Sequence, residues 1–239
     1  MMYRFFVSPD AIQGNAVTLP EPAAHQIRNV LRMRAGAHIV VLDNRGWEYT
    51  TEIIEIERKY VTGQIIEKQA AQGEPRVHLT LYQAILKRHN FELVLQKCTE
   101  IGVTCFVPMI TERTVVSDVK ESKRERWERI LTEAAEQSRR GKIPELRDPL
   151  EFGHAVSELS HYQIALIPYE NEQDTGLRDI LRPNILSAAV LIGPEGGFSE
   201  QEIALAHHAS PITLGARILR AETAAIVAST LILYELENA

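Results

Sequence analysis

The chain has 239 residues, of which 45% are hydrophobic and 24% charged, and its net charge at pH 7 is −6. This composition is ordinary for a globular protein with one large domain or two smaller ones. The net acidity argues against a general nucleic-acid binder, and no run of 18 apolar residues predicts a transmembrane helix.

The first seventy residues are rich in β-branched and aromatic side chains and are predicted to form strands at 5–7, 38–43, 47–56 and 60–68. Asp43-Asn44-Arg45-Gly46 is a hairpin turn signal between two of these strands. One helix, 22–33, places three polar side chains on one face: His25, Arg28 and Arg32. Together these elements predict a small barrel-like module with a polar helical flank.

After a short linker at 70–75, apolar strands alternate with helices. The strands are expected at 77–85, 104–110, 162–168 and 187–193, and the helices at 90–102, 120–140 and 221–236. Asn90 is the expected N-cap of the first of these helices, and Gly102 is its expected C-terminal glycine. This alternation predicts a parallel sheet that is covered by helices on both faces.

Charge is spread unevenly along the chain. Residues 151–239 carry 4 basic and 12 acidic side chains, whereas residues 1–150 have a small excess of basic ones. A polyanionic partner is therefore expected to contact the first two thirds of the chain.

Several kinds of site and destination are not expected. The two cysteines, Cys98 and Cys105, lie in apolar stretches, which predicts buried thiols and no disulfide framework. The eight histidines include no set with metal-ligand spacing, so no metal is predicted. The first residues lack the apolar core of a signal peptide, which indicates a cytoplasmic protein.

The strongest local signal is LIGPEGGFSEQE at 191–202, where an apolar strand enters a glycine loop. Gly193, Gly196 and Gly197 allow a sharp turn and a close approach of backbone to ligand. Ser199 and Glu202 form a capping box, which predicts a helix start. The loop matches neither the P-loop pattern nor the dinucleotide-binding pattern. Its glutamates favour a neutral or cationic ligand over a phosphate, although a plain strand-to-helix turn is an equally simple interpretation.

A second glycine loop follows in PITLGARILRAETAAIVAS. A short strand at 212–214 is interrupted by Gly215, and the next helix opens at Arg220-Ala221-Glu222-Thr223. Taken alone, this segment is consistent with helix capping. Two such loops in one third of the chain, both leading into helices, predict one shared pocket.

Together, GPEGGFS-x-x-E and LG-x-RILR-x-ETA resemble the signature of the SPOUT class of RNA methyltransferases, and more narrowly that of the RsmE family. Upstream segments agree in the same order over nearly the whole chain: His25–Arg32, Gln83–Lys87, Gln96–Val103, Thr111–Val116 and Glu133–Arg140. The chain departs from the family pattern at Arg88-His89-Asn90-Phe91, where a second lysine, or glycine and aspartate, is expected.

The resemblance implies an α/β protein with an N-terminal PUA-like β-barrel, residues 1–72, which binds RNA. It implies a SPOUT α/β domain, residues 73–239, with a deep trefoil knot near the C-terminus. The implied activity is methylation of N3 of a uridine in 16S, small-subunit ribosomal RNA, with S-adenosylmethionine as methyl donor. The family works as a homodimer with its site near the subunit interface.

The implied reaction and the positions of the candidate residues in the two glycine loops suggest their roles. Arg220 and Glu222 are the catalytic candidates, Glu222 as proton acceptor or orienting group and Arg220 as stabiliser of charge on uracil O4. The cofactor-binding candidates are Pro168, Leu191, Ile192, Gly193, Gly197, Leu214, Gly215 and Leu219. The RNA-binding candidates are Arg28, Arg32, Arg34, Lys87, Arg88, Arg113, Arg139, Arg140 and Lys142.

Two other functions remain open from the sequence. One is methyl transfer to a ribose 2′-hydroxyl of RNA on the same fold, from which the RILR-x-ET pattern points away. The other is a non-catalytic RNA-binding factor for ribosome assembly. The intact glycine loops argue against it, because an unused cofactor pocket has no evident reason to keep them.

Overall fold

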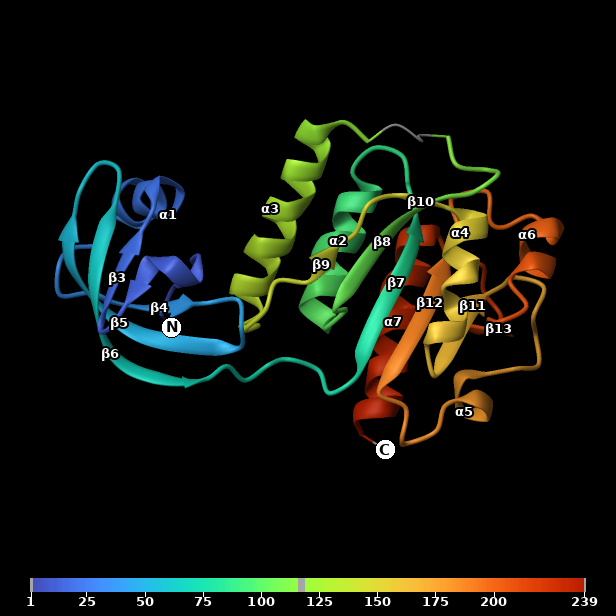
Figure 1. Cartoon of the computed structure of the whole chain (residues 1–239). Coiled ribbons are helices and arrows are strands. Elements are labelled where there is room, and N and C mark those ends of the chain that lie inside the picture. Colours follow the sequence, from blue (N-terminus) through green and yellow to red (C-terminus); the bar gives the residue numbers. More distant parts are fainter. Residues whose placement is uncertain (1, 116–118, 239) are drawn as a thin grey trace. The chain divides into compact units, whose positions relative to one another are not determined.

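The computed structural model describes residues 2–115 and 119–238, which leaves Val116, the end of one family segment, outside the described residues. The chain divides into two compact units (Figure 1). Unit 1 comprises Met1–Glu74 and Ala135–Ile143, and unit 2 comprises Pro75–Ala134 and Pro144–Ala239. Within the described ranges, no helix is long and apolar enough to cross a membrane.

Unit 1 is built on a six-stranded sheet with the order β1-β4-β5-β6-β3-β2. Its strands are β1 (Arg4–Phe6), β2 (Ile12–Gln13), β3 (Ala16–Leu19), β4 (His38–Leu42), β5 (Trp47–Ile56) and β6 (Val61–Ala70). Strand β1 pairs with β4 in parallel, and the other neighbours are antiparallel. The short strands β2 and β3 were not expected, because neither has enough alternating residues to stand out in the sequence.

The helix expected at 22–33 is shorter and irregular. Helix α1 (Glu21–His25) continues into one π-helical turn, η2 (Gln26–Val30), and a short 3-10 turn, η1 (Pro9–Ala11), precedes β2. Leu31 N donates to Gln26 O at 2.9 Å, and Arg32 then adopts a left-handed φ of 51°. Helix α1 buries Ala24 and the π-helical turn buries Ile27 in the core of the unit. Arg32 therefore lies outside the helix on which it was predicted.

A glutamate joins the two chain segments of unit 1. Glu74 Oε2 accepts a hydrogen bond from Arg140 Nη2 at 2.9 Å. Glu74 Oε1 accepts from the backbone N–H groups of Gly141 and Lys142 at 3.0 and 3.1 Å. The side chain of Arg140 is only 2% exposed, so this ion pair is a buried part of the unit.

Unit 2 contains a seven-stranded sheet in which all the paired strands run parallel, as predicted. Its strands are β7 (His78–Ala84), β8 (Cys105–Ile110), β9 (Glu145–Leu146), β10 (Leu150–Glu151), β11 (Ile164–Pro168), β12 (Ser187–Ile192) and β13 (Ser210–Ile212). The order is β10-β8-β7-β12-β11-β13, with β9 also paired to β8.

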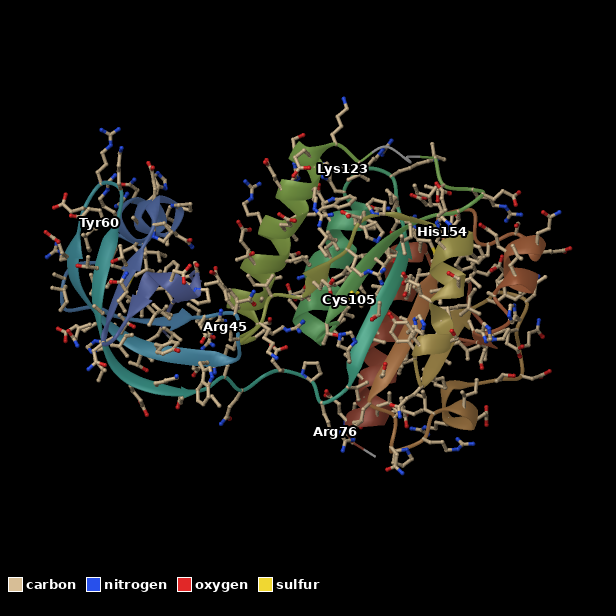
Figure 2. The ribbon with its side chains drawn as sticks, in the orientation of Figure 1. Arg45, Tyr60, Arg76, Cys105, Lys123 and His154 are labelled. Carbon is tan, nitrogen blue, oxygen red and sulfur yellow. The ribbon has the colours of Figure 1, made fainter. Side chains whose placement is uncertain are left out.

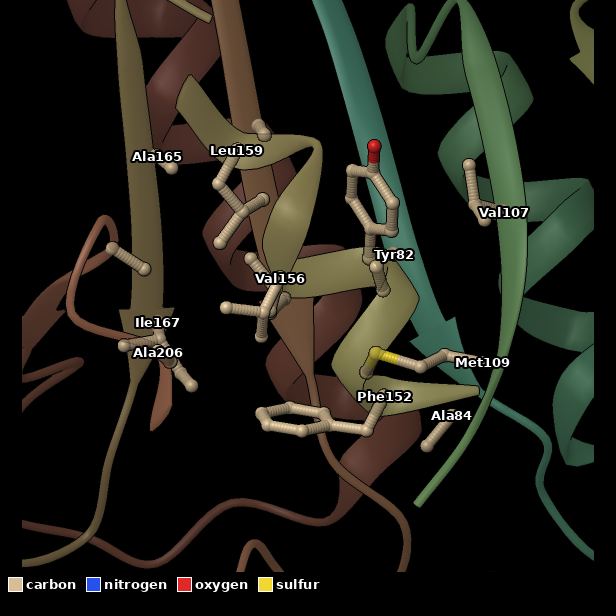
Figure 3. Close-up of a cluster of buried hydrophobic side chains, with 14 of the residues drawn as sticks. Tyr82, Ala84, Val107, Met109, Phe152, Val156, Leu159, Ala165, Ile167 and Ala206 are labelled. Carbon is tan, nitrogen blue, oxygen red and sulfur yellow. The ribbon is translucent and has the colours of Figure 1, made fainter. Parts of the chain in front are cut away.

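Helices lie on both faces of this sheet, as the alternation predicted (Figure 1). Helix α7 (Ala221–Glu237) packs on β7 and β12 and against α2 (Asn90–Ile101). Helix α3 (Glu121–Gln137) packs on α2 through Trp127, whose ring centroid lies 4.3 Å from that of Phe91. Helix α4 (Phe152–Ser157) covers the other face (Figure 3). The smaller helices are η3 (Leu159–His161), α5 (Leu177–Ile180) and α6 (Glu200–Leu205).

Several expected boundaries differ from the structure. Helix α3 ends at Gln137 and not at Gly141, and Asn90 is the first residue of α2, whose N-cap is His89. The strand expected at 212–214 is β13, two residues earlier, because Ser210, Pro211 and Ile212 pair with the end of β11. Both cysteines are buried thiols, as predicted, and Figure 2 shows Cys105 in the interior of unit 2.

Three polar side chains, Arg147, Glu158 and Tyr82, form a hydrogen-bonded cluster on the α4 side of unit 2. Arg147 forms a bidentate pair with Glu158, with Nη2 to Oε1 at 2.6 Å and Nη1 to Oε2 at 2.8 Å. The hydroxyl of Tyr82 donates to Glu158 Oε2 at 2.7 Å. The hydrogen bonds from Arg147 hold the pKa of Glu158 below its ordinary value of 4.5, and burial raises the pKa of Tyr82.

Glu158→Gln is therefore expected to lower the free energy of unfolding by about 2 kcal/mol at neutral pH, because it removes charge-assisted hydrogen bonds from a half-buried group. A lowered folded-state pKa stabilises the protein above the unfolded pKa, and this stability is lost as the pH falls through the folded value. Urea unfolding measures the difference, which is expected to vanish on acidification. Glu133→Gln, at a side chain that is 68% exposed, is the control. A Glu158→Gln effect that persisted in acid would contradict the assignment.

Candidate active site

The parallel sheet of unit 2 brings four loops to one edge. Strands β7, β11, β12 and β13 run in the same direction, so the segments that follow Ala84, Pro168, Ile192 and Ile212 leave from the same side. In open parallel sheets, this carboxyl edge is where ligands bind. A cavity of about 810 Å³ lies there, which is within the range of small-molecule sites.

Both glycine loops line this cavity, as the sequence predicted from their similar settings. Of the ten candidate catalytic and cofactor-binding residues, nine are in its wall: Pro168, Ile192, Gly193, Gly197, Leu214, Gly215, Leu219, Arg220 and Glu222. The exception is Leu191. It points to the opposite face of β12 and is fully buried in the core beneath α4 (the cluster of Figure 3), because alternate strand residues face opposite sides.

The first loop is a tight turn. Gly197 N donates to Pro194 O at 2.9 Å, and Gly197 has a left-handed φ of 67°. A Cβ at Gly193 would lie 3.3 Å from the ring of Phe198. Glycine at these two positions therefore brings the backbone itself to the cavity wall.

A buried carboxylate fastens the end of this loop. Glu202 is 5% exposed, and its Oε2 accepts from Ser199 N at 2.9 Å while Ser199 Oγ accepts from Glu202 N at 3.3 Å. This is the capping box predicted from the sequence. The other oxygen, Oε1, accepts from Glu112 N at 2.9 Å, which ties the loop after β8 to the glycine loop.

Two further contacts hold the glycine loop from outside. Arg113 Nη1 donates to Gly196 O at 2.6 Å and approaches Phe198 O at 3.4 Å. Glu195 Oε1 accepts from Lys87 N at 3.0 Å. Arg113 was predicted to bind RNA, but its guanidinium is used to brace the loop.

The second loop, 213–220, also depends on a glycine. Gly215 has a φ of 106°, and its N–H donates to Thr213 Oγ1 at 3.2 Å. Thr213 N in turn donates to Thr175 O at 2.9 Å, so the loop is held by the segment after β11. Arg220 is the N-cap of α7, and its carbonyl accepts from Ala224 N at 2.8 Å. Ile218 in this loop is 90% exposed.

The cavity wall has more acid than base. Glu170, Glu172, Glu195 and Glu222 line it together with Arg217 and Arg220. Hydrogen bonds from the backbone N–H groups of Thr175 and Asp174 lower the pKa of Glu172. The carboxylate of Glu170 lies close to the first glycine loop, since a Cβ added to Gly197 would be 3.1 Å from Glu170 Oε1. Such a wall favours a ligand that carries positive charge, as the glutamates of the loop had suggested.

The sequence missed several polar residues of this wall, among them Asn90, Glu170 and Glu172. Asn90 had been assigned to helix capping. The two glutamates follow the strand that ends at Pro168, and their position at the carboxyl end of a parallel strand was the available signal.

The RNA-binding candidates divide between the units. Lys87, Arg88 and Arg113 belong to unit 2, and Arg28, Arg32, Arg34, Arg139, Arg140 and Lys142 belong to unit 1. All but Arg28 and Arg140 are exposed. Arg140 does not fit the prediction, because its guanidinium is buried against Glu74. Among the described residues, no group of His, Cys, Asp and Glu has the arrangement of a metal site.

Comparisons with known proteins show which families the two parts of the chain match. Residues 73–233 match the RNA methyltransferase domain family, and residues 19–66 match the RNA methyltransferase PUA domain family. Ribosomal RNA small subunit methyltransferase E of Synechocystis is 37% identical over 233 residues, covering 95% of this chain and 76% of that protein. The Bacillus subtilis protein of the same name is 32% identical, covering 89% and 88% of the two chains.

Two solved structures superpose on nearly the whole chain. A methyltransferase from Legionella pneumophila in complex with the cofactor SAM has a TM-score of 0.91 and 34% identity, and each chain is covered to 98%. Ribosomal RNA small subunit methyltransferase E from Neisseria gonorrhoeae, bound to S-adenosyl methionine, has a TM-score of 0.90 and 31% identity with the same coverage.

Glu202→Ala tests the brace of the glycine loop. The substitution leaves the N–H groups of Ser199 and Glu112 without their acceptor, so we expect a loss of about 2–3 kcal/mol in the free energy of unfolding. Urea denaturation gives the value. Glu200→Ala, in the same first turn but exposed, is the matched control and is expected to change stability by less than about 0.5 kcal/mol. Equal effects of the two substitutions would show that the buried carboxylate is no brace.

Proposed function

Because the chain belongs to the ribosomal RNA small subunit methyltransferase E family, we propose that it transfers a methyl group from S-adenosylmethionine to N3 of a uridine in 16S, small-subunit ribosomal RNA. The observation that carries this proposal is the cavity at the carboxyl edge of the unit 2 sheet. It combines two glycine loops, an acidic wall and the pair Arg220 and Glu222.

The wall of the cavity fits S-adenosylmethionine. Ile192, Leu214 and Leu219 offer apolar surface for the adenine, and Gly193 and Gly197 allow the backbone to approach it closely. The carboxylates of Glu170 and Glu172 suit a ligand with a positively charged sulfonium. When bound, the cofactor supplies the methyl group: the S–CH₃ bond breaks, its electron pair stays on sulfur, and the N3–CH₃ bond forms.

The residues of this chain have to remove the N3 proton and stabilise the resulting charge. Glu222 accepts the proton in our proposal, and Arg220 donates hydrogen bonds to O4 of the uracil, where negative charge accumulates. A carboxylate is a weak base for this proton. Removal of the N3 proton therefore depends on hydrogen-bond donors that stabilise the uracil anion, and on a fixed position of the uracil ring relative to Glu222.

We extend the proposal to the parts of the chain. Residues 1–72 form a PUA-like barrel that binds RNA, and residues 73–239 form the SPOUT methyltransferase domain. Arg113 is left out because its guanidinium braces the glycine loop, and the other exposed arginines and lysines of the predicted set contact RNA phosphates: Arg32, Arg34, Lys87, Arg88, Arg139 and Lys142. The match of residues 19–66 to an RNA methyltransferase PUA family supports this division.

The dimer, the knot and a cytoplasmic location are also proposed. Exposed apolar side chains on α7 and on the loop before it, Leu231, Tyr234 and Ile218, support a second copy of the chain as partner. The resemblance of the two C-terminal motifs to the SPOUT class supports the knot. The proposed substrate, ribosomal RNA of an assembling or complete small subunit, supports a cytoplasmic location of the protein.

Nucleoside analysis by mass spectrometry tests the reaction. Ribosomal RNA from cells that lack the protein is expected to contain one site that gains 3-methyluridine after incubation with the protein and S-adenosylmethionine. Glu222→Gln is expected to slow this transfer by at least about 100-fold, as for loss of a general base, with normal folding. A 2′-O-methylated product would keep the fold and overturn the chemistry. Unchanged RNA with normal cofactor binding would make the protein a binding factor.

Glu170→Gln tests whether the acidic wall selects a cation. S-adenosylmethionine carries a sulfonium charge that S-adenosylhomocysteine lacks, so the substitution is expected to weaken binding of the former by about fivefold more than of the latter. Isothermal titration calorimetry measures both. Glu200→Gln, outside the cavity wall, is the control and is expected to change neither. A parallel loss of both affinities would assign Glu170 to an uncharged part of the ligand.

A further inference from the structure

The start of α2 contributes one residue to the cavity lining, and the proposed reaction gives this residue no role. Asn90, the first residue of α2, lines the cavity together with the two glycine loops. It also lies in the short stretch where the sequence departs from the family pattern. Its side chain is therefore a polar group of the wall that the proposed reaction does not use.

The backbone around Asn90 is held in place. Lys87 N donates to Glu195 Oε1 at 3.0 Å, which connects this loop to the first glycine loop. Asn90 N donates to Lys87 O at 3.3 Å. Between them, Arg88 has a left-handed φ of 56°, a conformation that is costly for a residue with a Cβ. Strain of this kind persists where surrounding contacts fix the chain, and such positions are common at binding sites.

The carboxamide of Asn90 is available to a ligand. The side chain is partly exposed, and the described residues offer it no hydrogen-bond partner. The carboxamide of Asn44, by contrast, is used within the fold, since its Oδ1 accepts a hydrogen bond from Ile143 N at 2.7 Å. A carboxamide presents two N–H donors and one acceptor and carries no charge. It therefore suits a neutral, hydrogen-bonding part of a ligand better than a phosphate or a sulfonium.

The target base offers such a part. N3 of uracil lies between two carbonyl oxygens, O2 and O4, and removal of the N3 proton spreads negative charge over both. A fixed N–H donor to each oxygen would stabilise this anion and leave N3 itself unobstructed for the methyl group. Arg220 lines the same cavity from the start of α7 and is one such donor in the proposed reaction.

We propose that Asn90 is the second donor: its Nδ2 hydrogen-bonds the uracil oxygen O2, while Arg220 serves O4. The inference rests on the proposed function, since it concerns the base that is methylated. It makes Asn90 a substrate-contacting residue that lowers the energy of the deprotonated uracil, and the loop 85–89 the element that positions it.

Asn90→Ala and Asn90→Asp test this role in the full-length protein. Single-turnover methyl transfer to ribosomal RNA that lacks the modification is expected to slow by about 100-fold for Asn90→Ala, the effect of losing one donor to a developing anion. Asn90→Asp is expected to be slower still, because a carboxylate opposes the negative charge. Gln96→Ala, at an exposed position of the same helix, is the control.

Two further readouts separate a contact with the base from a structural role. The rise of the transfer rate with pH is expected to move to higher pH in Asn90→Ala, because the N3 proton becomes harder to remove. The dissociation constant of S-adenosylmethionine is expected to stay unchanged. A rate within twofold of the unaltered protein, an unmoved pH profile, or a cofactor affinity that falls as much as the rate would each overturn the proposal.

Failure of this inference is distinguishable from failure of the proposed function. If the unaltered protein forms no 3-methyluridine, the proposed function fails and the role of Asn90 falls with it. If the unaltered protein forms 3-methyluridine and the Asn90 variants do so equally well, only the role of Asn90 is overturned.

Discussion

The common direction of the strands in unit 2 is the constraint on which the site depends. Parallel pairing of β7, β12, β11 and β13 sends the segment after each strand to one edge of the sheet, although the first and last of these strands end 128 residues apart, at Ala84 and Ile212. Neither glycine loop makes a cavity by itself. Side by side they supply a wall of backbone, apolar side chains and carboxylates that a small molecule can enter.

Hydrogen bonds to carboxylates then fix the loops at this edge. Glu202 joins the first glycine loop to the loop after β8, and Glu195 joins it to the loop after β7. The two glutamates of the same short motif thus act in opposite surroundings, one buried within the protein and one at the rim of the cavity. A loop that opens a helix therefore carries acid where a phosphate-binding loop carries lysine, because Glu202 and Glu195 fasten it to neighbouring loops and Glu195 also lines the cavity.

Much of this could be predicted from the sequence, and the reasons for the exceptions are physical. Alternating apolar strands and amphipathic helices indicated the parallel sheet, and the S-x-x-E spacing indicated the capping box at Ser199. Strands as short as β2 and β9 carry too few residues for a periodic pattern, and β13 is defined by pairing with β11 rather than by its own composition. In the site, glycine positions were informative because their backbone geometry is local. The side chain of Leu191 lies outside the cavity wall, because the face to which a strand residue points depends on the whole sheet.

The arginines show most clearly what one-dimensional information lacks. Arg113, Arg139 and Arg140 are equally basic in the sequence, yet one braces a loop, one is exposed and one is buried against Glu74. The difference lies in partners that are 66 or more residues away in the chain for the two that are engaged. A guanidinium donates hydrogen bonds to a carboxylate or a peptide carbonyl as readily as to a phosphate, so its residue type cannot distinguish a structural brace from an RNA contact. Candidate RNA contacts are therefore those whose donors the fold leaves unused, and the same reasoning singles out the carboxamide of Asn90 at the cavity.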